Sequence, residues 1–178
     1  KEGFTPFLAD TISPVVHNDQ MVTFRINAPE AEEVLLFWSI MTGLQADAPV
    51  PFTKNENGMW SLTVGPLSPN IYKYKFIVDG VPIVDPNNTF GGFENQPGYS
   101  YVVVHGDGPA WYDAKDVPHG VVSRHIYHSD VLDAQREMYV YMPPGYDSSK
   151  EYPVLYLLGG SGEIAPTWSR IGRVNFIM

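Results

Sequence analysis

The chain has 178 residues, with 20 acidic residues against 11 Lys and Arg, so its formal net charge is −9. This charge disfavours a nucleic-acid partner, because phosphate binding needs a basic surface. The absence of cysteine excludes disulfides, thiolate metal sites and a cysteine nucleophile. The sequence contains no apolar stretch of bilayer-spanning length, so we expect no membrane partner.

The first part of the chain carries short β-type runs separated by turn residues. Alternating or β-branched residues predict strands at Met21–Ile26, Glu33–Trp38, Met59–Val64, Ile71–Val78 and Tyr99–Val104. In the fourth run, Tyr72, Tyr74 and Phe76 share one face, which predicts a core side and a solvent side. Asp79-Gly80 predicts a tight hairpin turn. The spacing predicts a small antiparallel β-sandwich over residues 1–105.

Residues 106–119 are predicted to be a linker, because the glycine-rich stretch His105-Gly-Asp-Gly-Pro109 marks its start. Beyond them, strands are predicted at Val121–Tyr127, Arg136–Met142 and Tyr152–Leu158, and a helix is predicted to begin at Thr167. Strands followed by a helix indicate the start of an α/β sheet over residues 120–178. The apolar third strand ends at Gly159-Gly160, where the backbone can turn tightly and direct N–H groups outward.

Several runs carry a resemblance to known families. The runs Arg124–Ser129, Arg136–Tyr146 and Tyr152–Gly160 resemble the opening of the esterase D-like α/β-hydrolases, which include feruloyl and acetyl-xylan esterases of carbohydrate esterase family 1. The runs Trp60–Leu67, Tyr72–Gly80 and Val84–Pro86 resemble an early-set, immunoglobulin-like domain related to carbohydrate-binding module family 48. The resemblance implies a mainly β chain, with an immunoglobulin-like (early-set) sandwich followed by the incomplete start of an α/β-hydrolase domain.

The resemblance also implies a role for the glycine turn. It places the backbone of Gly160 and Ser161 at the oxyanion hole of a serine hydrolase. The family nucleophile stands in a Gly-x-Ser-x-Gly elbow. The stretches 159–163 and 98–102 both lack its final glycine, so Ser161 and Ser100 are rejected as nucleophiles. We therefore expect this chain alone to be inactive.

Aromatic and lysine side chains of the sandwich are candidates for sugar binding, because pyranose C–H faces stack on aromatic rings. The resemblance favours Lys75, which matches a glucan-contacting lysine of starch-binding modules, although Pro82 replaces a binding tryptophan. An alternative interpretation places the Trp and Tyr candidates in the core. The candidates are Trp38, Trp60, Tyr72 and Lys75, with Tyr99 as an outlying member.

No cofactor or metal site is predicted from the sequence. His125 and His128 lie three residues apart, so on a strand they point to opposite faces and do not share a ligand. Walker, Rossmann and EF-hand patterns are absent from the sequence.

The predicted function is that of an N-terminal fragment of a feruloyl or acetyl-xylan esterase acting on a polysaccharide or oligosaccharide ester. Two alternatives stay open, a ferric-siderophore esterase of the enterobactin type and a non-catalytic carbohydrate-binding or spacer module. We expect a secreted or periplasmic protein whose signal peptide has been removed. We also expect self-association through the incomplete hydrolase segment, since its apolar strand has no cover.

Overall fold

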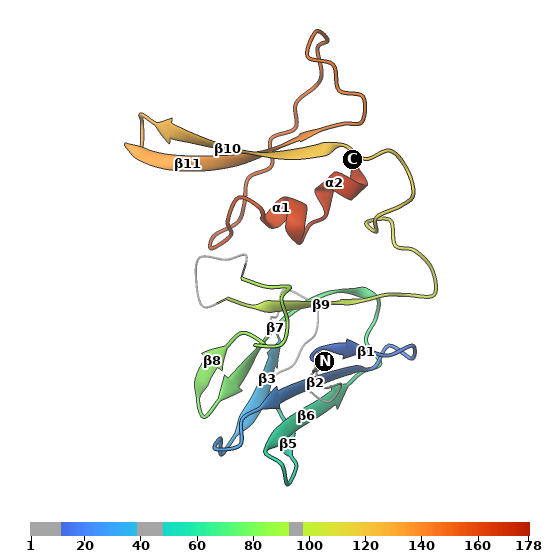
Figure 1. The fold of residues 1–178 in the computed structure, drawn as a ribbon, viewed down its shortest axis with the longest axis vertical. Helices are drawn as coiled ribbons and strands as arrows, with labels where there is room; N and C mark the ends of the chain where they lie inside the picture. The colour runs from blue at the N-terminus through green and yellow to red at the C-terminus, as the bar shows by residue number, and fades with distance from the viewer. Residues whose placement is uncertain (1–11, 39–47, 93–97) are drawn as a thin grey trace, which may run out of the picture. The chain divides into compact units, whose positions relative to one another are not determined.

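The structure is a computed structural model that describes residues 12–38, 48–92 and 98–178. The chain divides into two compact units, which we describe separately. Unit 1 comprises the described residues up to Gly108, and unit 2 runs from Pro109 to Met178 (Figure 1). Strands account for 39% of the described residues and helices for 5%, so the described chain is mainly β, as predicted. The described part of the chain has no helix long and apolar enough to cross a membrane.

Unit 1 is built from two antiparallel sheets. The first has the order β1-β2-β6-β5, and the second has the order β4-β3-β7-β8, with β9 also paired to β7. The strands of the first sheet are β1 (Val15–Val16), β2 (Val22–Asn27), β5 (Thr53–Lys54) and β6 (Met59–Val64). Those of the second are β3 (Val34–Trp38), β4 (Val50–Pro51), β7 (Asn70–Val78), β8 (Val81–Ile83) and β9 (Ser100–Val104). The five strands predicted in this part of the chain are therefore confirmed.

The core of unit 1 lies between the two sheets. On β7 the side chains of Tyr72, Tyr74 and Phe76 are buried, whereas those of the intervening residues are only half-buried, as the alternation predicts. Across the sandwich, Phe24 of β2 places its ring 4.7 Å from that of Tyr74. The same ring lies 5.5 Å from that of Trp38 on β3. Residues on opposite sheets therefore pack into one continuous aromatic core.

A tight turn joins β7 to β8. Asp79 and Gly80 have φ angles of 46° and 81°, and positive φ at both central residues is the mark of the type I′ hairpin turn. The Asp79 carboxylate also accepts hydrogen bonds from the backbone N–H groups of Glu32 and Glu33, over 2.9 and 2.8 Å. The predicted Asp79-Gly80 hairpin is confirmed, and its aspartate additionally anchors the entry to β3.

Four strands of two or three residues, β1, β4, β5 and β8, escaped sequence prediction. Their neighbours in the sheets, rather than an internal pattern, define strands this short. Strand β4 pairs with β3 in the second sheet, whereas β5 pairs with β6 in the first, so the chain changes sheet at Phe52. The backbone N–H of Phe52 donates to the carbonyl of Val34 over 2.9 Å, and its ring lies 5.2 Å from that of Phe76.

A buried carboxylate lies in unit 1. Asp85 is 1% exposed, and its Oδ2 accepts hydrogen bonds from the Ser13 hydroxyl over 2.6 Å and from the Tyr74 hydroxyl over 2.8 Å. Its Oδ1 accepts from the N–H of Asn87, and its own N–H donates to the Ser100 hydroxyl. Burial raises the pKa of Asp85, although these hydrogen bonds act in the opposite direction. Burial and the neighbouring Asp85 charge raise the pKa of Tyr74 as well.

Unit 2 contains one β-hairpin and two short helices. Strands β10 (Val121–Ser129) and β11 (Ala134–Met142) pair along nine positions, which confirms the first two strands predicted there. The helices are α1 (Thr167–Arg170) and α2 (Val174–Ile177). Helical structure therefore begins at Thr167 as predicted, but it stops after one turn, because Arg173 adopts a left-handed conformation with φ of 49°.

The prediction of a third strand in this part, at Tyr152–Leu158, is wrong. These residues pair with no other strand within the described chain, and their apolar side chains are exposed, with Val154 at 68%, Tyr156 at 83% and Leu158 at 86%. A strand exists only as part of a hydrogen-bonded ladder, so a correct apolar pattern is not sufficient where no neighbour is available.

The boundary between the units falls inside the predicted linker 106–119. The part of this segment that belongs to unit 2 contacts the end of the chain. Asp113 accepts a hydrogen bond from the Arg173 guanidinium over 3.0 Å, and both side chains are largely buried. The His119 ring lies 5.6 Å from that of Phe176. The segment after Pro109 is thus an integral part of unit 2.

Candidate functional site

The glycine-rich segment after Leu158 forms a β-turn. The N–H of Glu163 donates to the carbonyl of Gly160 over 3.2 Å, which closes the turn around Ser161 and Gly162. Gly162 has a φ of 87°, whereas Ser161 has no positive φ. Positive φ at the third position alone characterises a type II turn and favours glycine there. The sequence thus encodes the turn through Gly162.

Two side chains fasten this turn to the chain around it. The Glu163 Oε2 accepts a hydrogen bond from the Gly160 N–H over 2.9 Å. The Trp168 indole N–H donates to the carbonyl of Leu158 over 3.1 Å. Sequence reasoning missed the role of Glu163. The available signal was a glutamate three residues after the N–H that it accepts, which is the spacing of the glutamate in a helix capping box.

The two predicted oxyanion donors differ in availability. The Gly160 N–H is occupied by the Glu163 carboxylate. In contrast, no group among the described residues accepts a hydrogen bond from the Ser161 N–H. A backbone N–H in this state can bind a developing negative charge on a substrate oxygen. Of the two predicted donors, the one that remains available is therefore the Ser161 N–H.

Three of the predicted sugar-binding residues lie in the core of unit 1. Trp38, Trp60 and Tyr72 are 5%, 7% and 3% exposed. The Trp60 indole donates to the carbonyl of Ala28 over 2.8 Å, and the Tyr72 hydroxyl donates to that of Ser68 over 2.7 Å. The rings of these residues pack against other core side chains, so their faces are covered in this fold.

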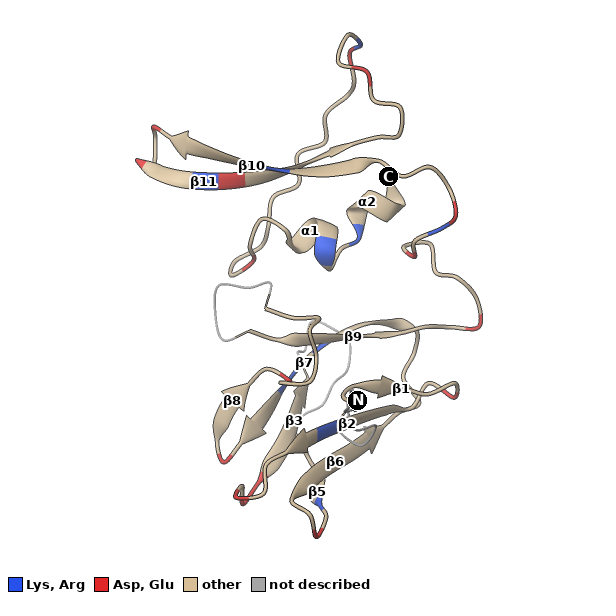
Figure 2. Cartoon of the chain, viewed as in Figure 1, with Lys and Arg blue, Asp and Glu red and all other residues tan. Residues whose placement is uncertain are grey.

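Lys75, the fourth candidate, lies on the opposite face of β7. Its ammonium group is 4.7 Å from the ring centroid of Tyr99 and 5.0 Å from that of Phe37. The Lys73 ammonium is 4.2 Å from the same Tyr99 ring. We call Phe37, Lys73, Lys75 and Tyr99 the lysine–aromatic patch. Figure 2 marks the lysines and the acidic residues of both units.

The structure thus brings Lys75 together with the outlying candidate Tyr99, and separates both from the three core aromatics. Sequence reasoning missed Phe37 as a member of this patch. Its signal was the alternation within β3, where Phe37 lies between the buried Leu36 and Trp38 and is itself half-buried. The pairing of Phe37 with Lys75 across the two strands required the observed register.

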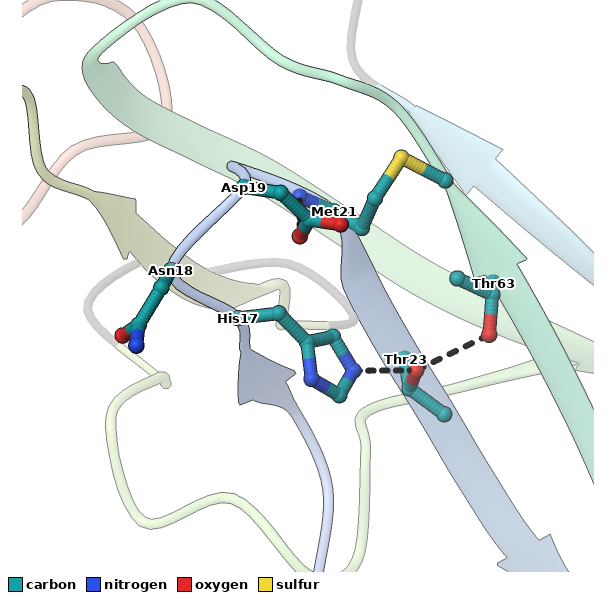
Figure 3. Close-up of a pocket in the computed structure, with 6 residues that line it drawn as sticks. All are labelled: His17, Asn18, Asp19, Met21, Thr23 and Thr63. Carbon is teal, nitrogen blue, oxygen red and sulfur yellow. Dashed lines mark hydrogen bonds between the residues drawn. The ribbon is translucent and has the colours of Figure 1, made fainter.

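An open depression lies beside β1, β2 and β6 (Figure 3). The His17 Nε2 and the Thr23 hydroxyl are 2.7 Å apart, and that hydroxyl is 2.8 Å from the hydroxyl of Thr63. Figure 3 shows Asn18 and Asp19 on the turn beside this chain of hydrogen bonds. The His17 ring lies within hydrogen-bond distance of the Thr23 hydroxyl, but no third side chain among the lining residues bonds to that ring and orients it as a base, so we assign the depression no chemistry.

The residues that the structure describes contain no group of three or more His, Asp or Glu side chains placed to hold a metal ion. His125 and His128 both lie on β10, three residues apart. The His128 ring nitrogen lies 3.5 Å from the carboxylate of Asp133, at the exposed end of the hairpin. The histidines therefore belong to the surface of the β10–β11 hairpin.

No family model matches the chain. The chain is 30% identical over 173 residues to an endo-1,4-beta-xylanase/feruloyl esterase of Xylanibacter ruminicola. The alignment covers 93% of this chain but only 23% of that relative. The chain therefore spans about a quarter of the length of the relative that it matches.

Solved structures that resemble the chain include two esterases and a putative amylase. An enterobactin esterase from Shigella flexneri has a TM-score of 0.49 and 18% identity, covering 71% of this chain and 41% of that one. A ferric enterobactin esterase from Salmonella typhimurium has a TM-score of 0.45 and 16% identity, covering 73% and 43%. A putative alpha amylase from Salmonella typhimurium has a TM-score of 0.43 and 24% identity, covering 58% and 18%. These TM-scores are too low to establish a shared fold.

Proposed function

We propose that this chain is part of a carbohydrate esterase that removes feruloyl or acetyl groups from xylan. The observation that carries this proposal is the similarity to an endo-1,4-beta-xylanase/feruloyl esterase, which extends over 93% of the chain and hence over both units. The ordered turn at 159–163 supports the same activity, because ester hydrolysis needs a donor for the developing oxyanion.

In the proposed reaction, a serine attacks the ester carbonyl, and a tetrahedral oxyanion forms before the alcohol leaves and an acyl-enzyme remains. The contribution of this chain is the Ser161 N–H, which would donate a hydrogen bond to that oxyanion. We identify no nucleophile and no base in this chain. We therefore expect the 178-residue chain to leave p-nitrophenyl acetate and methyl ferulate unhydrolysed.

A substrate panel tests the proposed activity on a longer polypeptide that contains this chain. Feruloylated xylo-oligosaccharide, acetylated xylan and a catecholate triester would be compared under one set of conditions. Release of ferulate or acetate from the xylan substrates is the expected result. Hydrolysis of the catecholate triester alone would establish the siderophore alternative, and no hydrolysis of any substrate would favour a non-catalytic role.

We propose that unit 1 is an accessory carbohydrate-binding module that uses the lysine–aromatic patch. The two rings offer apolar surface for a sugar, and the ammonium of Lys75 can donate to hydroxyl groups beside them. Retention on insoluble xylan and starch tests this role. Lys75→Ala and Tyr99→Ala should each lower retention, whereas Glu56→Ala, an exposed change elsewhere on unit 1, should not. No retention of the wild type would make unit 1 a spacer.

We further propose that the protein is secreted or periplasmic. Its proposed substrate is a polymer that does not cross a membrane, so the enzyme must reach it outside the cytoplasm. Cell fractionation of the producing organism, followed by detection of the protein in each fraction, tests this location. Detection in the cytoplasmic fraction alone would contradict it.

A further inference from the structure

The glycine turn after Leu158 contains three glycines among its five residues, Gly159 to Glu163. Glycine has more backbone freedom than any other residue, so such a segment loses more conformational entropy when it is ordered. Oxyanion binding requires the opposite condition, a donor already fixed in direction before the reaction begins. Some interaction must therefore hold the segment.

Glu163 makes two hydrogen bonds that meet this requirement. Its carboxylate accepts from the N–H of Gly160 over 2.9 Å, and its own N–H donates to the carbonyl of the same residue over 3.2 Å. The peptide planes on both sides of Gly160 are thereby fixed. Because each peptide unit is planar, the Gly160 carbonyl and the Ser161 N–H lie in one plane and point in opposite directions. Fixing that carbonyl fixes the direction of the Ser161 N–H.

Of the two hydrogen bonds between Glu163 and Gly160, the one that the Glu163 carboxylate accepts is the stronger. A hydrogen bond to an ionised carboxylate is roughly twice as strong as one between neutral groups. The carboxylate also lies close to the glycines, since a Cβ added at Gly159 would be 3.5 Å from Oε2 and one at Gly160 would be 3.7 Å from it. Glu163 therefore reaches back over the start of the turn and occupies the N–H of Gly160, the other predicted donor.

We propose that Glu163 is the positioning residue of the oxyanion turn, and that its carboxylate holds Gly160 so that, of the two predicted donors, Ser161 presents its N–H to the substrate oxyanion. This role rests on the proposed esterase function. Glu163 itself does not touch the reacting atoms; it acts through the backbone of the turn. The residue thereby occupies one predicted donor, at Gly160, and sets the direction of the other, at Ser161.

Amide hydrogen exchange on the 178-residue chain tests the holding of the turn directly. In the wild type, the Gly160 amide should exchange slowly and the Ser161 amide quickly. In Glu163→Ala, the exchange rate of the Gly160 amide should rise to that of the Ser161 amide. In Glu163→Gln, which keeps a neutral acceptor, the exchange rate of the Gly160 amide should lie between its rates in the wild type and in Glu163→Ala. Glu151→Ala, an exposed glutamate in the same unit, is the matched control and should change neither rate. Unchanged Gly160 protection in Glu163→Ala would overturn the proposal.

Kinetics on a longer, active polypeptide tests the consequence for catalysis. Glu163→Ala should lower kcat about a hundredfold with little change in KM, because displacement of a catalytic group by about 1 Å costs that much. Glu163→Gln should restore part of the loss, which a purely structural defect would not show. An unchanged kcat in Glu163→Ala would refute the positioning role while the esterase function stands. If the longer polypeptide has no esterase activity, the proposed function is refuted. If its Gly160 amide nevertheless loses protection from exchange in Glu163→Ala, the conclusion that Glu163 holds the turn stands.

Discussion

The Tyr74 hydroxyl donates to the Asp85 carboxylate over 2.8 Å inside unit 1. The same carboxylate oxygen accepts from the Ser13 hydroxyl, and the Asp85 N–H donates to the hydroxyl of Ser100. Through its side chain and its backbone N–H, the buried Asp85 thus joins β7 and β9 to a residue near the start of the described chain. Buried polar groups of this kind stabilise a fold only while every partner is present.

Tyr74→Phe is expected to destabilise unit 1 by about 1–3 kcal/mol, because it leaves the buried Asp85 with one donor fewer. The change also removes an acceptor from the Asn88 side chain, which donates to the Tyr74 oxygen over 2.9 Å. Denaturant unfolding followed by tryptophan fluorescence measures the loss. Tyr72→Phe is the matched control, since its hydroxyl donates to the neutral carbonyl of Ser68 and not to a carboxylate, and it should cost less. Equal costs for both changes would contradict the special role of the carboxylate.

The stability of unit 1 should carry a pH dependence from Asp85. Burial raises the pKa of this carboxyl in the folded state, so the folded chain binds the proton more tightly than the unfolded chain. The resulting contribution is fully present below the unfolded pKa of about 3.9 and is lost as the pH rises through the folded value. Relative to Asp85→Asn, the wild type should therefore lose free energy of unfolding as the pH rises above about 4 and through the raised pKa of the folded state. A difference that is constant or grows with pH would contradict this sign.

Trp38→Ala and Trp60→Ala should both lower the stability of unit 1, each by roughly 3–5 kcal/mol, because both rings are buried in its core. Trp111→Ala serves as the control, since that indole is 67% exposed, and its cost should be far smaller. Thermal unfolding of the three variants measures the difference. Retention of the wild-type Tm by Trp38→Ala would mean that its ring is not a core element.

Ser161→Pro should remove the proposed oxyanion donor while keeping the turn, because proline is common at the second position of a type II turn. In a longer, active polypeptide, kcat should fall about 10²–10³-fold, as it does when one oxyanion-hole donor is lost. Ser161→Ala keeps the N–H and should lose much less, which separates the backbone group from the hydroxyl. Equal losses in the two variants would assign the effect to the side chain instead.

The isolated 178-residue chain should self-associate or be cleaved readily within unit 2. Residues 152–158 expose a run of apolar side chains, and the β10–β11 hairpin is a sheet of only two strands. Exposed apolar surface and unpaired strand edges favour association with another chain. Sedimentation and limited proteolysis measure both properties, with a chain that ends at Gly108 as the compact, monomeric control. A monodisperse full chain that resists proteolysis throughout would contradict this expectation.

The strands of unit 1 were predictable where one face of a strand is buried. Along β7, Tyr72, Tyr74 and Phe76 alternate with less buried residues, and the Asp79-Gly80 turn fixes the register that follows. The failure at residues 152–158 has the opposite cause. Their composition fits a buried strand, but whether a strand forms depends on a neighbouring strand, which no local pattern encodes.

The candidate site was predictable only in part. The glycines drew attention to the turn, and the resemblance to esterases pointed to Gly160 and Ser161. The assignment of the free donor to Ser161 required the contact between Glu163 and Gly160, which depends on side-chain conformation. Likewise, Lys75 was recognisable on its strand, but its contact with the Tyr99 ring joins two residues that are far apart in the sequence.

The change of sheet at Phe52 has a consequence for how unit 1 tolerates evolutionary change. Strands β4 and β5 belong to different sheets and are separated by that single residue. One residue added or deleted there would reverse the faces of one strand relative to the other and would move the Phe52 ring away from Phe76. Length variation should therefore accumulate at the exposed turn residues 55–57, and the segment 50–54 should keep a constant length among relatives of this protein.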